Sequence, residues 1–340
     1  MAGLDAAAWD GLLRHARACG LLSRLAADVR SAGVFDGLPE IVRHHMRAAE
    51  IVAERQHRAV RWEVHKLRQA LAPLACPIVL LKGAAYVMAG LSPARGRILG
   101  DIDLLLPRDR LDQAETLLRF AGWFGAGHDA YDQRYYREWM HELPPVTHFR
   151  RGSTLDLHHN ILPLTARCKP QAERLWTGVR RLDAELHRLG DADLVIHAAT
   201  HLYHEGEWGY GLRNLADIDA LLREFGARDE FWTSLTARAA ELDLARPLAY
   251  ALRHAAALLA TPMPVPALAW AQRTIGLRAG FMDGLFRRGF ATAHIEFDDA
   301  WSGLARFALY VRSHWLKMPP HRLLPHLARK ALRRQPEEST

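Results

Sequence analysis

The sequence predicts an α+β protein, with a small mixed sheet and its own helices flanked on both sides by helical segments. Apolar residues recur at intervals of three and four over residues 5–72 and again from about residue 166, as on amphipathic helices. Between these segments, short runs of Leu, Ile and Val are bounded by Pro and Gly, which is typical of strands. We therefore expect an N-terminal helical region at 1–75, an α+β core at 76–165 and a C-terminal helical domain at 166–340.

The N-terminal region contains one long amphipathic helix. Residues 50–74, EIVAERQHRAVRWEVHKLRQALAPL, keep helical spacing up to Pro73, which cannot continue a helix because it lacks an N–H donor. We expect two to four helices in this region and little chemistry.

The central segment predicts alternating strands and helices. In order, we expect a strand at 77–83, a short helix at 83–91, a strand at 101–107, an amphipathic helix at 108–123 and a hairpin at 146–161. Two runs of alternating polarity flank Gly152-Ser153, which suits a two-residue turn with glycine at its first position. From about residue 166 to the end of the chain we expect helices.

Composition narrows the class of partner and the compartment. The net charge of +7 favours anionic partners such as nucleotides, and no nucleic-acid-binding motif accompanies it, so nucleic acid is not the expected partner. No segment approaches the ~20 apolar residues of a membrane span, and the N-terminus lacks a signal-peptide pattern. We expect a cytoplasmic protein.

The three cysteines are far apart and suggest neither a disulfide framework nor a thiolate zinc site.

Two aspartates interrupt the apolar stretch LGDIDLLL at 99–106. Residues i and i+2 of a strand share one face, so Asp101 and Asp103 should point the same way. An isolated buried carboxylate is costly unless its charge is compensated. The pair therefore either lies at a solvated strand end or holds a cation.

A third acid follows the same logic in TLDLHH, where Asp156 lies between two leucines. Asp156 should share the polar face of its strand with His158. If this strand pairs beside the first, three carboxylates converge. Hard oxygen ligands of this kind suit Mg²⁺ or Mn²⁺, and Mg²⁺ commonly takes one or two carboxylates together with substrate phosphates.

Upstream of the acids lies a glycine turn that suits a phosphate. Gly83 opens a short helix after a strand, and a helix N-terminus offers free N–H groups to anions. Lys82 adds a positive charge at this turn. Arg95 and Arg97, between the turn and the acids, are further candidates for binding the anion.

The order of these features resembles that of the nucleotidyltransferase superfamily that includes DNA polymerase beta. More closely, LLKGAAY, RGRILGDIDLLL and LDLHH resemble a family of uncharacterised bacterial nucleotidyltransferases with a Lys-Gly turn. The resemblance covers residues 76–165 and extends to HLYHE and LRNLADIDALL in the C-terminal part. It implies a minimal nucleotidyltransferase core with helical elements on both sides.

The resemblance also implies an activity and a set of roles. The protein would transfer an NMP group from an NTP such as ATP to an acceptor, with release of pyrophosphate. Asp101 and Asp103 would bind both metal ions, and Asp156 would complete the catalytic metal site and help to activate the acceptor hydroxyl. The superfamily usually has Gly-Ser at the turn, whereas this chain has Lys82-Gly83-Ala84, so phosphate binding must rely on the backbone, Lys82 or the arginines.

Further candidates for substrate contact come from the helical part. His201 lies on one helical face with His197 and His204, and Arg213 precedes Asp217 by one helical turn. Asp217 opens a second Asp-x-Asp sequence, but its neighbours have helical spacing, and residues i and i+2 of a helix do not share a face. We expect no metal site there, although Asp217 and Arg213 could face the substrate. His158 is a candidate on the strand of Asp156.

Two alternatives stay open at this point. The Asp-x-Asp pair also suits a nucleotide-sugar glycosyltransferase, although such enzymes usually have a larger α/β region before it. The missing turn hydroxyl suits a non-catalytic binding or scaffold protein on a degenerate nucleotidyltransferase core. The sequence names neither the base of the NTP nor the acceptor, which could be a small molecule, a peptide or a protein.

Overall fold

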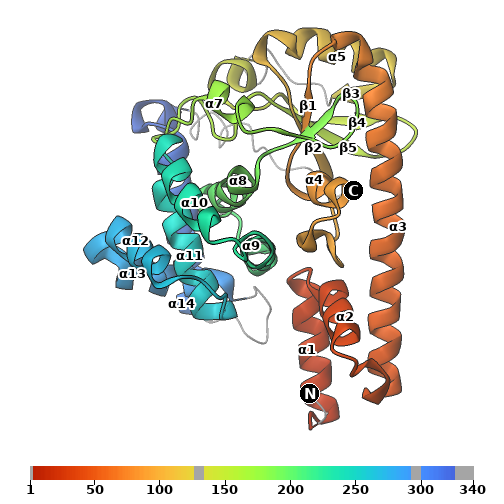
Figure 1. Cartoon of the computed structure of the whole chain (residues 1–340), viewed down its shortest axis with the longest axis vertical. Helices are drawn as coiled ribbons and strands as arrows, with labels where there is room; N and C mark the ends of the chain where they lie inside the picture. The colour runs from red at the N-terminus through yellow and green to blue at the C-terminus, as the bar shows by residue number, and fades with distance from the viewer. Residues whose placement is uncertain (1–2, 126–133, 292–299, 326–340) are drawn as a thin grey trace, which may run out of the picture.

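The computed structural model describes residues 3–125, 134–291 and 300–325. One seven-stranded mixed sheet lies among helices that precede and follow it in the chain (Figure 1). The α+β class and the flanking helices are therefore confirmed. Across the part of the chain described, none of the helices combines the length and apolarity needed to cross a membrane.

Three helices precede the sheet. They are α1 (Ala6–Ala18), α2 (Leu22–Ser31) and α3 (Glu40–Leu71). The third begins well before the predicted start at residue 50, and a 3-10 turn containing Pro73 follows its end. It runs along one side of the molecule, from α1 and α2 to the sheet (Figure 1). Its first turns close a small separate core that includes Trp9, Val29 and Met46.

The sheet has the strand order β3-β4-β5-β2-β1-β7-β6. The strands are β1 (Ile78–Leu80), β2 (Asp101–Leu105), β3 (Trp123–Gly125), β4 (Val146–His148), β5 (Thr154–His158), β6 (Arg180–Arg181) and β7 (Leu186–Arg188). The central strand β2 is antiparallel to β1 and parallel to β5. Its residues from Ile102 to Leu105 are buried, as expected for a strand covered on both faces.

The expectation of helices alone after residue 166 was wrong at the two strands β6 and β7. They form an antiparallel pair, and β7 lies parallel to β1, which extends the sheet beyond the predicted core. Strands of two and three residues are too short to show a period in the sequence. Only the pairing of the two strands with each other, and of β7 with β1, distinguishes them from a loop.

The hairpin of β4 and β5 is confirmed, but its turn differs from the prediction. The strands pair from Thr147 to Thr154, and the His148 N–H donates to the Ser153 carbonyl at 2.9 Å. The connection therefore spans residues 149–153 and is longer than the two residues expected. Gly152 takes a φ of +67°, and the His148 ring accepts from the Arg150 and Arg151 N–H groups.

Helices cover the sheet and continue beyond it. They are α4 (Lys82–Ala89), α5 (Leu111–Phe120), α7 (Ala172–Trp176), α8 (Asp191–His204), α9 (Gly211–Phe225), α10 (Asp229–Glu241), α11 (Ala245–Leu259), α12 (Val265–Ile275), α13 (Ala279–Phe290) and α14 (Ala300–Lys317). The helices from α8 onward gather on the opposite side of the sheet from α3 (Figure 1). One apolar core joins Val64 of α3, the sheet and Leu309 of α14, so the C-terminal helices share a continuous core with the strands.

Candidate functional site

The two acidic strands lie side by side. In the parallel ladder of β2 and β5, Asp103 is opposite Asp156, and Asp101 is opposite Thr154. Asp103 is 2 % exposed, while Asp101 is exposed at the start of β2, where a cavity of about 220 Å³ borders it. The structure thus brings Asp103 and Asp156 together and leaves Asp101 at the rim of the site.

Helix α3 holds the segment that leads into β2. The side-chain amide of Gln56 pairs with both backbone polar groups of Leu99, accepting from its N–H at 2.7 Å and donating to its carbonyl. The His57 Nε2 lies 2.8 Å from the carbonyl oxygen of Arg97. These contacts satisfy backbone groups that have no partner strand, and they place the start of β2.

The turn between β1 and α4 directs Lys82 toward the acids. Lys82 has a φ of +44°, which is rare for a residue with a side chain and costs free energy. Its Nζ lies 2.7 Å from Asp103 Oδ1, and the preceding N–H, of Leu81, donates to the Asp103 carbonyl at 3.0 Å. A Cβ on Gly83 would lie 2.6 Å from Leu99 Cδ2, so a larger residue here would require the Leu99 side chain to move.

His158 approaches Asp103 from the end of β5. Its Nε2 donates to Asp103 Oδ1 at 2.9 Å, and its Nδ1 lies 3.3 Å from Glu142 Oε2. One ligand atom from each of Asp103, Asp156 and His158 lies within 4.8 Å of the others. The arrangement is therefore a compact cluster of carboxylates and imidazole with a lysine beside it.

The two facing aspartates have opposite electrostatic environments. Burial alone would raise the pKa of Asp103, but the nearby Lys82 and His158 outweigh it and hold that pKa well below its usual range. Burial, followed by the charges of Asp103 and Glu142, raises the pKa of Asp156 to about 7. Loss of hydration and the Asp103 charge also raise the pKa of Asp101. Groups whose pKa values are pushed apart in this way are typical of sites that move protons.

A cluster of arginines lies next to the acids, around the buried carboxylate of Asp217 on α9. Arg97 Nε is 3.2 Å from one oxygen of Asp217, and Arg24 Nη1 from α2 is 3.4 Å from the other. Arg213 lies close enough to both Arg97 and Asp217 for their charges to affect its pKa, which falls to about 10 mainly because the guanidinium is buried. Three guanidinium groups thus face one carboxylate, which leaves an excess of positive charge beside Asp101.

A family model described as uncharacterised nucleotidyltransferase matches residues 5–260. This range contains the three N-terminal helices, the whole sheet and the helices up to α11. The chain belongs to this nucleotidyltransferase family. Neither the curated proteins nor the solved structures gave a match.

Two of the predicted site residues of this nucleotidyltransferase lie apart from the acids. Arg95 pairs with Asp28 and donates to Ser31 Oγ at 3.0 Å, both on α2. His201, on α8, has its Nε2 3.3 Å from Glu205 Oε2. The pKa of His201 falls to about 3 because it is desolvated and because Lys82 adds a nearby positive charge. Arg95 thus lines the surface between α2 and α9, whereas His201 lies within electrostatic range of the cluster.

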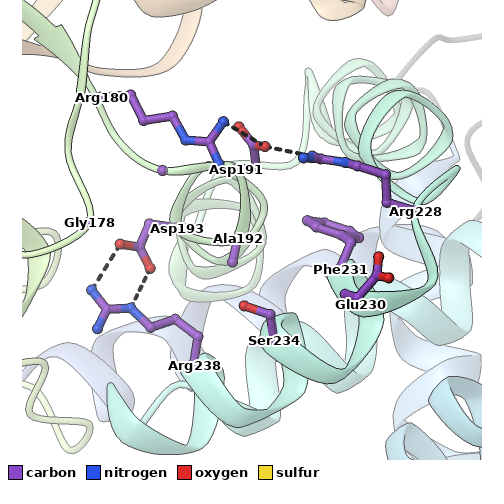
Figure 2. A pocket seen from close by; sticks show the side chains of 11 residues that line it. Gly178, Arg180, Asp191, Ala192, Asp193, Arg228, Glu230, Phe231, Ser234 and Arg238 are labelled. Atoms are coloured by element: carbon purple, nitrogen blue, oxygen red, sulfur yellow. Dashed lines mark hydrogen bonds and ion pairs between the residues drawn. The ribbon is translucent and has the colours of Figure 1, made fainter.

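A polar pocket of about 340 Å³ lies at the start of α8. Figure 2 shows that Asp191 is paired with Arg180 and Arg228, and that Arg238 donates two hydrogen bonds to the carboxylate of Asp193. The arginines that line this pocket are therefore compensated by the two aspartates of the first turn. These ion pairs hold the start of α8 against β6 and α10.

Several residues of the site gave no signal in the sequence. Glu142 and His141 lie in a connection without strand or helix periodicity, and Glu142 reaches His158 through an isolated antiparallel bridge. Arg24 belongs to a helix far from the acids in the chain. The loop that carries Arg95 and Arg97 passes close to α2 at Gly96, where a Cβ would lie 2.5 Å from the backbone of α2. Such contacts depend on tertiary packing.

Proposed function

We propose that this nucleotidyltransferase transfers an NMP group from an NTP to an acceptor hydroxyl in a metal-dependent reaction that releases pyrophosphate. The observation that carries this proposal is the facing pair of Asp103 and Asp156 on adjacent strands, with Asp101 two residues earlier on β2. The turn carrying Lys82 lies directly beside the pair. The acceptor would be a small molecule, a peptide or a protein.

The residues present fit a hard divalent cation. Asp156 Oδ1 is buried and receives no hydrogen bond from the described residues, which is costly for a carboxylate oxygen unless a ligand completes it. Asp101, Asp103 and Asp156 would hold Mg²⁺ or Mn²⁺, both of which favour carboxylate oxygens. When bound, such ions neutralise charge on the phosphates and polarise them for displacement.

The protein's own groups would bind the nucleotide and receive the proton. Lys82 and Arg97 are the positive charges next to the acids and would orient the triphosphate in place of a turn hydroxyl. As the acceptor oxygen forms its bond to the α-phosphorus, its proton would pass to the carboxylate of Asp156. Before a cation binds, burial and the neighbouring carboxylates raise the pKa of Asp156, which favours its role as a proton acceptor. The bond to pyrophosphate breaks in the same displacement.

The glycosyltransferase alternative receives less support. One strand, β1, precedes β2 along the described chain, and the residues before β1 form helices. A nucleotide-sugar site of the usual kind is built on several strands before its Asp-x-Asp. A measurement of nucleotide binding distinguishes the scaffold alternative from the enzyme.

The first test is calorimetric titration of ATP, GTP, CTP and UTP into the protein, each with and without Mg²⁺. We expect Mg²⁺-dependent binding of at least one nucleotide and its loss in Asp101→Ala/Asp103→Ala, because the cation ligands are removed. The matched control is Asp109→Ala/Asp112→Ala, which removes two exposed acids and should leave binding unchanged. Absence of nucleotide binding by the folded wild type would favour a scaffold on a degenerate core.

A further inference from the structure

A short segment beside the end of β5 carries two side chains that the proposed reaction does not use. Glu142 pairs with His158 in an isolated antiparallel bridge, and the Leu143 N–H donates to the Leu157 carbonyl at 2.8 Å. The carbonyl of His141 accepts from the His159 N–H at 2.8 Å. The backbone of residues 141–143 is therefore held firmly against β5.

The side chains of His141, Glu142 and His158 converge. One ligand atom from each lies within 4.8 Å of the others, and Glu142 Oε2 lies 3.3 Å from His158 Nδ1 and 3.6 Å from His141 Nε2. The Nδ1 atoms of both histidines are buried and make no hydrogen bond with the described residues. An unpartnered buried imidazole nitrogen is costly, and a cation beside Glu142 would give the Nδ1 of His158 a partner.

We infer that His141, Glu142 and His158 form a second cation site, specific for a divalent transition metal such as Zn²⁺. Two imidazoles and one carboxylate are the donors of many zinc sites with one open position, whereas Mg²⁺ favours oxygen donors. The side chains of Glu142 and His141 are 24 % and 17 % exposed, so the site is accessible to an ion from solvent.

The two nitrogens of His158 separate this site from the acidic one. Nε2 donates to Asp103 Oδ1 at 2.9 Å, which leaves Nδ1 with its lone pair toward Glu142. A metal-bound histidine commonly donates its other N–H to a carboxylate, which fixes its tautomer and orientation. A metal at Nδ1 would thus hold His158 as a positioning residue for Asp103. A transition metal held instead by Asp103, Asp156 and His158 would have to bind Nε2 of His158. That nitrogen already donates its hydrogen to Asp103.

Two lysines lie near the proposed site, and each is already paired. Lys82 contacts Asp103 at 2.7 Å, and Lys317 Nζ on α14 lies 3.3 Å from Glu205 Oε1. Each lysine therefore has an ion-pair partner other than Glu142.

The test is a calorimetric titration of Zn²⁺ into chelator-treated full-length protein, with excess Mg²⁺ and without nucleotide. We expect one equivalent of Zn²⁺ to bind, and His141→Ala and the isosteric Glu142→Gln to weaken binding at least tenfold. Asp156→Asn should keep the Zn²⁺ site, and so should His44→Ala, which removes the histidine of an exposed His44–Glu40 pair. Circular dichroism of each variant checks that it is folded, and the visible spectrum of the Co²⁺ form reports nitrogen ligation.

The inference is overturned if wild type binds no Zn²⁺, or if His141→Ala and Glu142→Gln bind it as tightly as wild type. Loss of Zn²⁺ in Asp156→Asn with retention in His141→Ala would place the ion in the acidic cluster instead. These results do not depend on NTP binding, so this inference and the proposed function can fail separately.

Discussion

At the scale of single residues, Asp103 is the most constrained group of the site. The same oxygen of Asp103 contacts Lys82 Nζ at 2.7 Å and His158 Nε2 at 2.9 Å. These partners keep the carboxylate ionised in a buried position, while its neighbour Asp156, with an oxygen that no described group contacts, has a pKa of about 7. Two residues of the same type on adjacent strands thus differ mainly through their partners.

Substituting Lys82 should change the affinities for cation and nucleotide in opposite directions. Lys82→Met removes a positive charge next to a proposed metal ligand, so Mg²⁺ alone should bind several-fold more tightly at pH 8. The same change removes a proposed phosphate partner, and NTP should bind at least about tenfold more weakly, as for the loss of one charged hydrogen bond. Titration calorimetry measures both. Weakening of Mg²⁺ binding by Lys82→Met would contradict this prediction.

At the scale of elements, two helices and a loop converge on one buried carboxylate. Arg97 from the loop before β2 and Arg24 from α2 both contact Asp217 of α9. Burial raises the pKa of Asp217 despite these arginines, so the ion pairs do not fully repay the cost of desolvation. The cluster nevertheless joins the N-terminal helices, the site loop and the C-terminal helices.

Removing the shared carboxylate should destabilise the fold strongly. Asp217→Asn leaves buried guanidinium groups uncompensated, and we expect a loss of about 3 kcal/mol in the free energy of unfolding. The matched control is Asp28→Asn, which breaks the exposed pair with Arg95 and should cost less than about 1 kcal/mol. Urea unfolding of both variants measures the difference. Equal losses would show that burial of the cluster contributes little.

At the scale of the whole molecule, the C-terminal helices bury several histidines in neutral form. His197, His204 and His254 are at most 4 % exposed. Burial lowers the pKa of His197 well below its usual range and lowers those of His204 and His254 to about 4. The unfolded chain, in contrast, takes up these protons near pH 6.5. Acid should therefore favour the unfolded state.

Stability should fall as the pH is lowered from 6.5 toward 4.5. Each buried histidine contributes a slope of up to about 1.4 kcal/mol per pH unit, because only the unfolded state binds its proton in this window. The raised pKa values of Asp101, Asp156 and Asp217 act in the opposite direction. His201, with its pKa of about 3, adds to the effect of the three histidines, and we expect the histidines to have the larger effect. His204→Asn should reduce the slope of the free energy of unfolding against pH by up to the contribution of one histidine. Urea unfolding at a series of pH values measures it, and stability that rises toward pH 4.5 would contradict the prediction.

The sequence by itself determined those features that depend on local pattern. Helical spacing identified the helices on both sides of the sheet, and the run LGDIDLLL identified β2 with its two acids. Alternation along β5 placed Asp156 between leucines that the structure buries. These features follow from periods of two and 3.6 residues, which the chain encodes without reference to distant segments.

Only the tertiary structure decided which residues and segments come into contact with these elements. The parallel pairings that set Asp103 opposite Asp156 and β7 beside β1 join residues far apart in sequence, and the approach of Glu142 to His158 joins two segments that are not neighbours in the chain. The same is true of Arg24 and Asp217. Such contacts depend on register and on the packing of helices over the whole core, and they leave no local period in the sequence that could predict them.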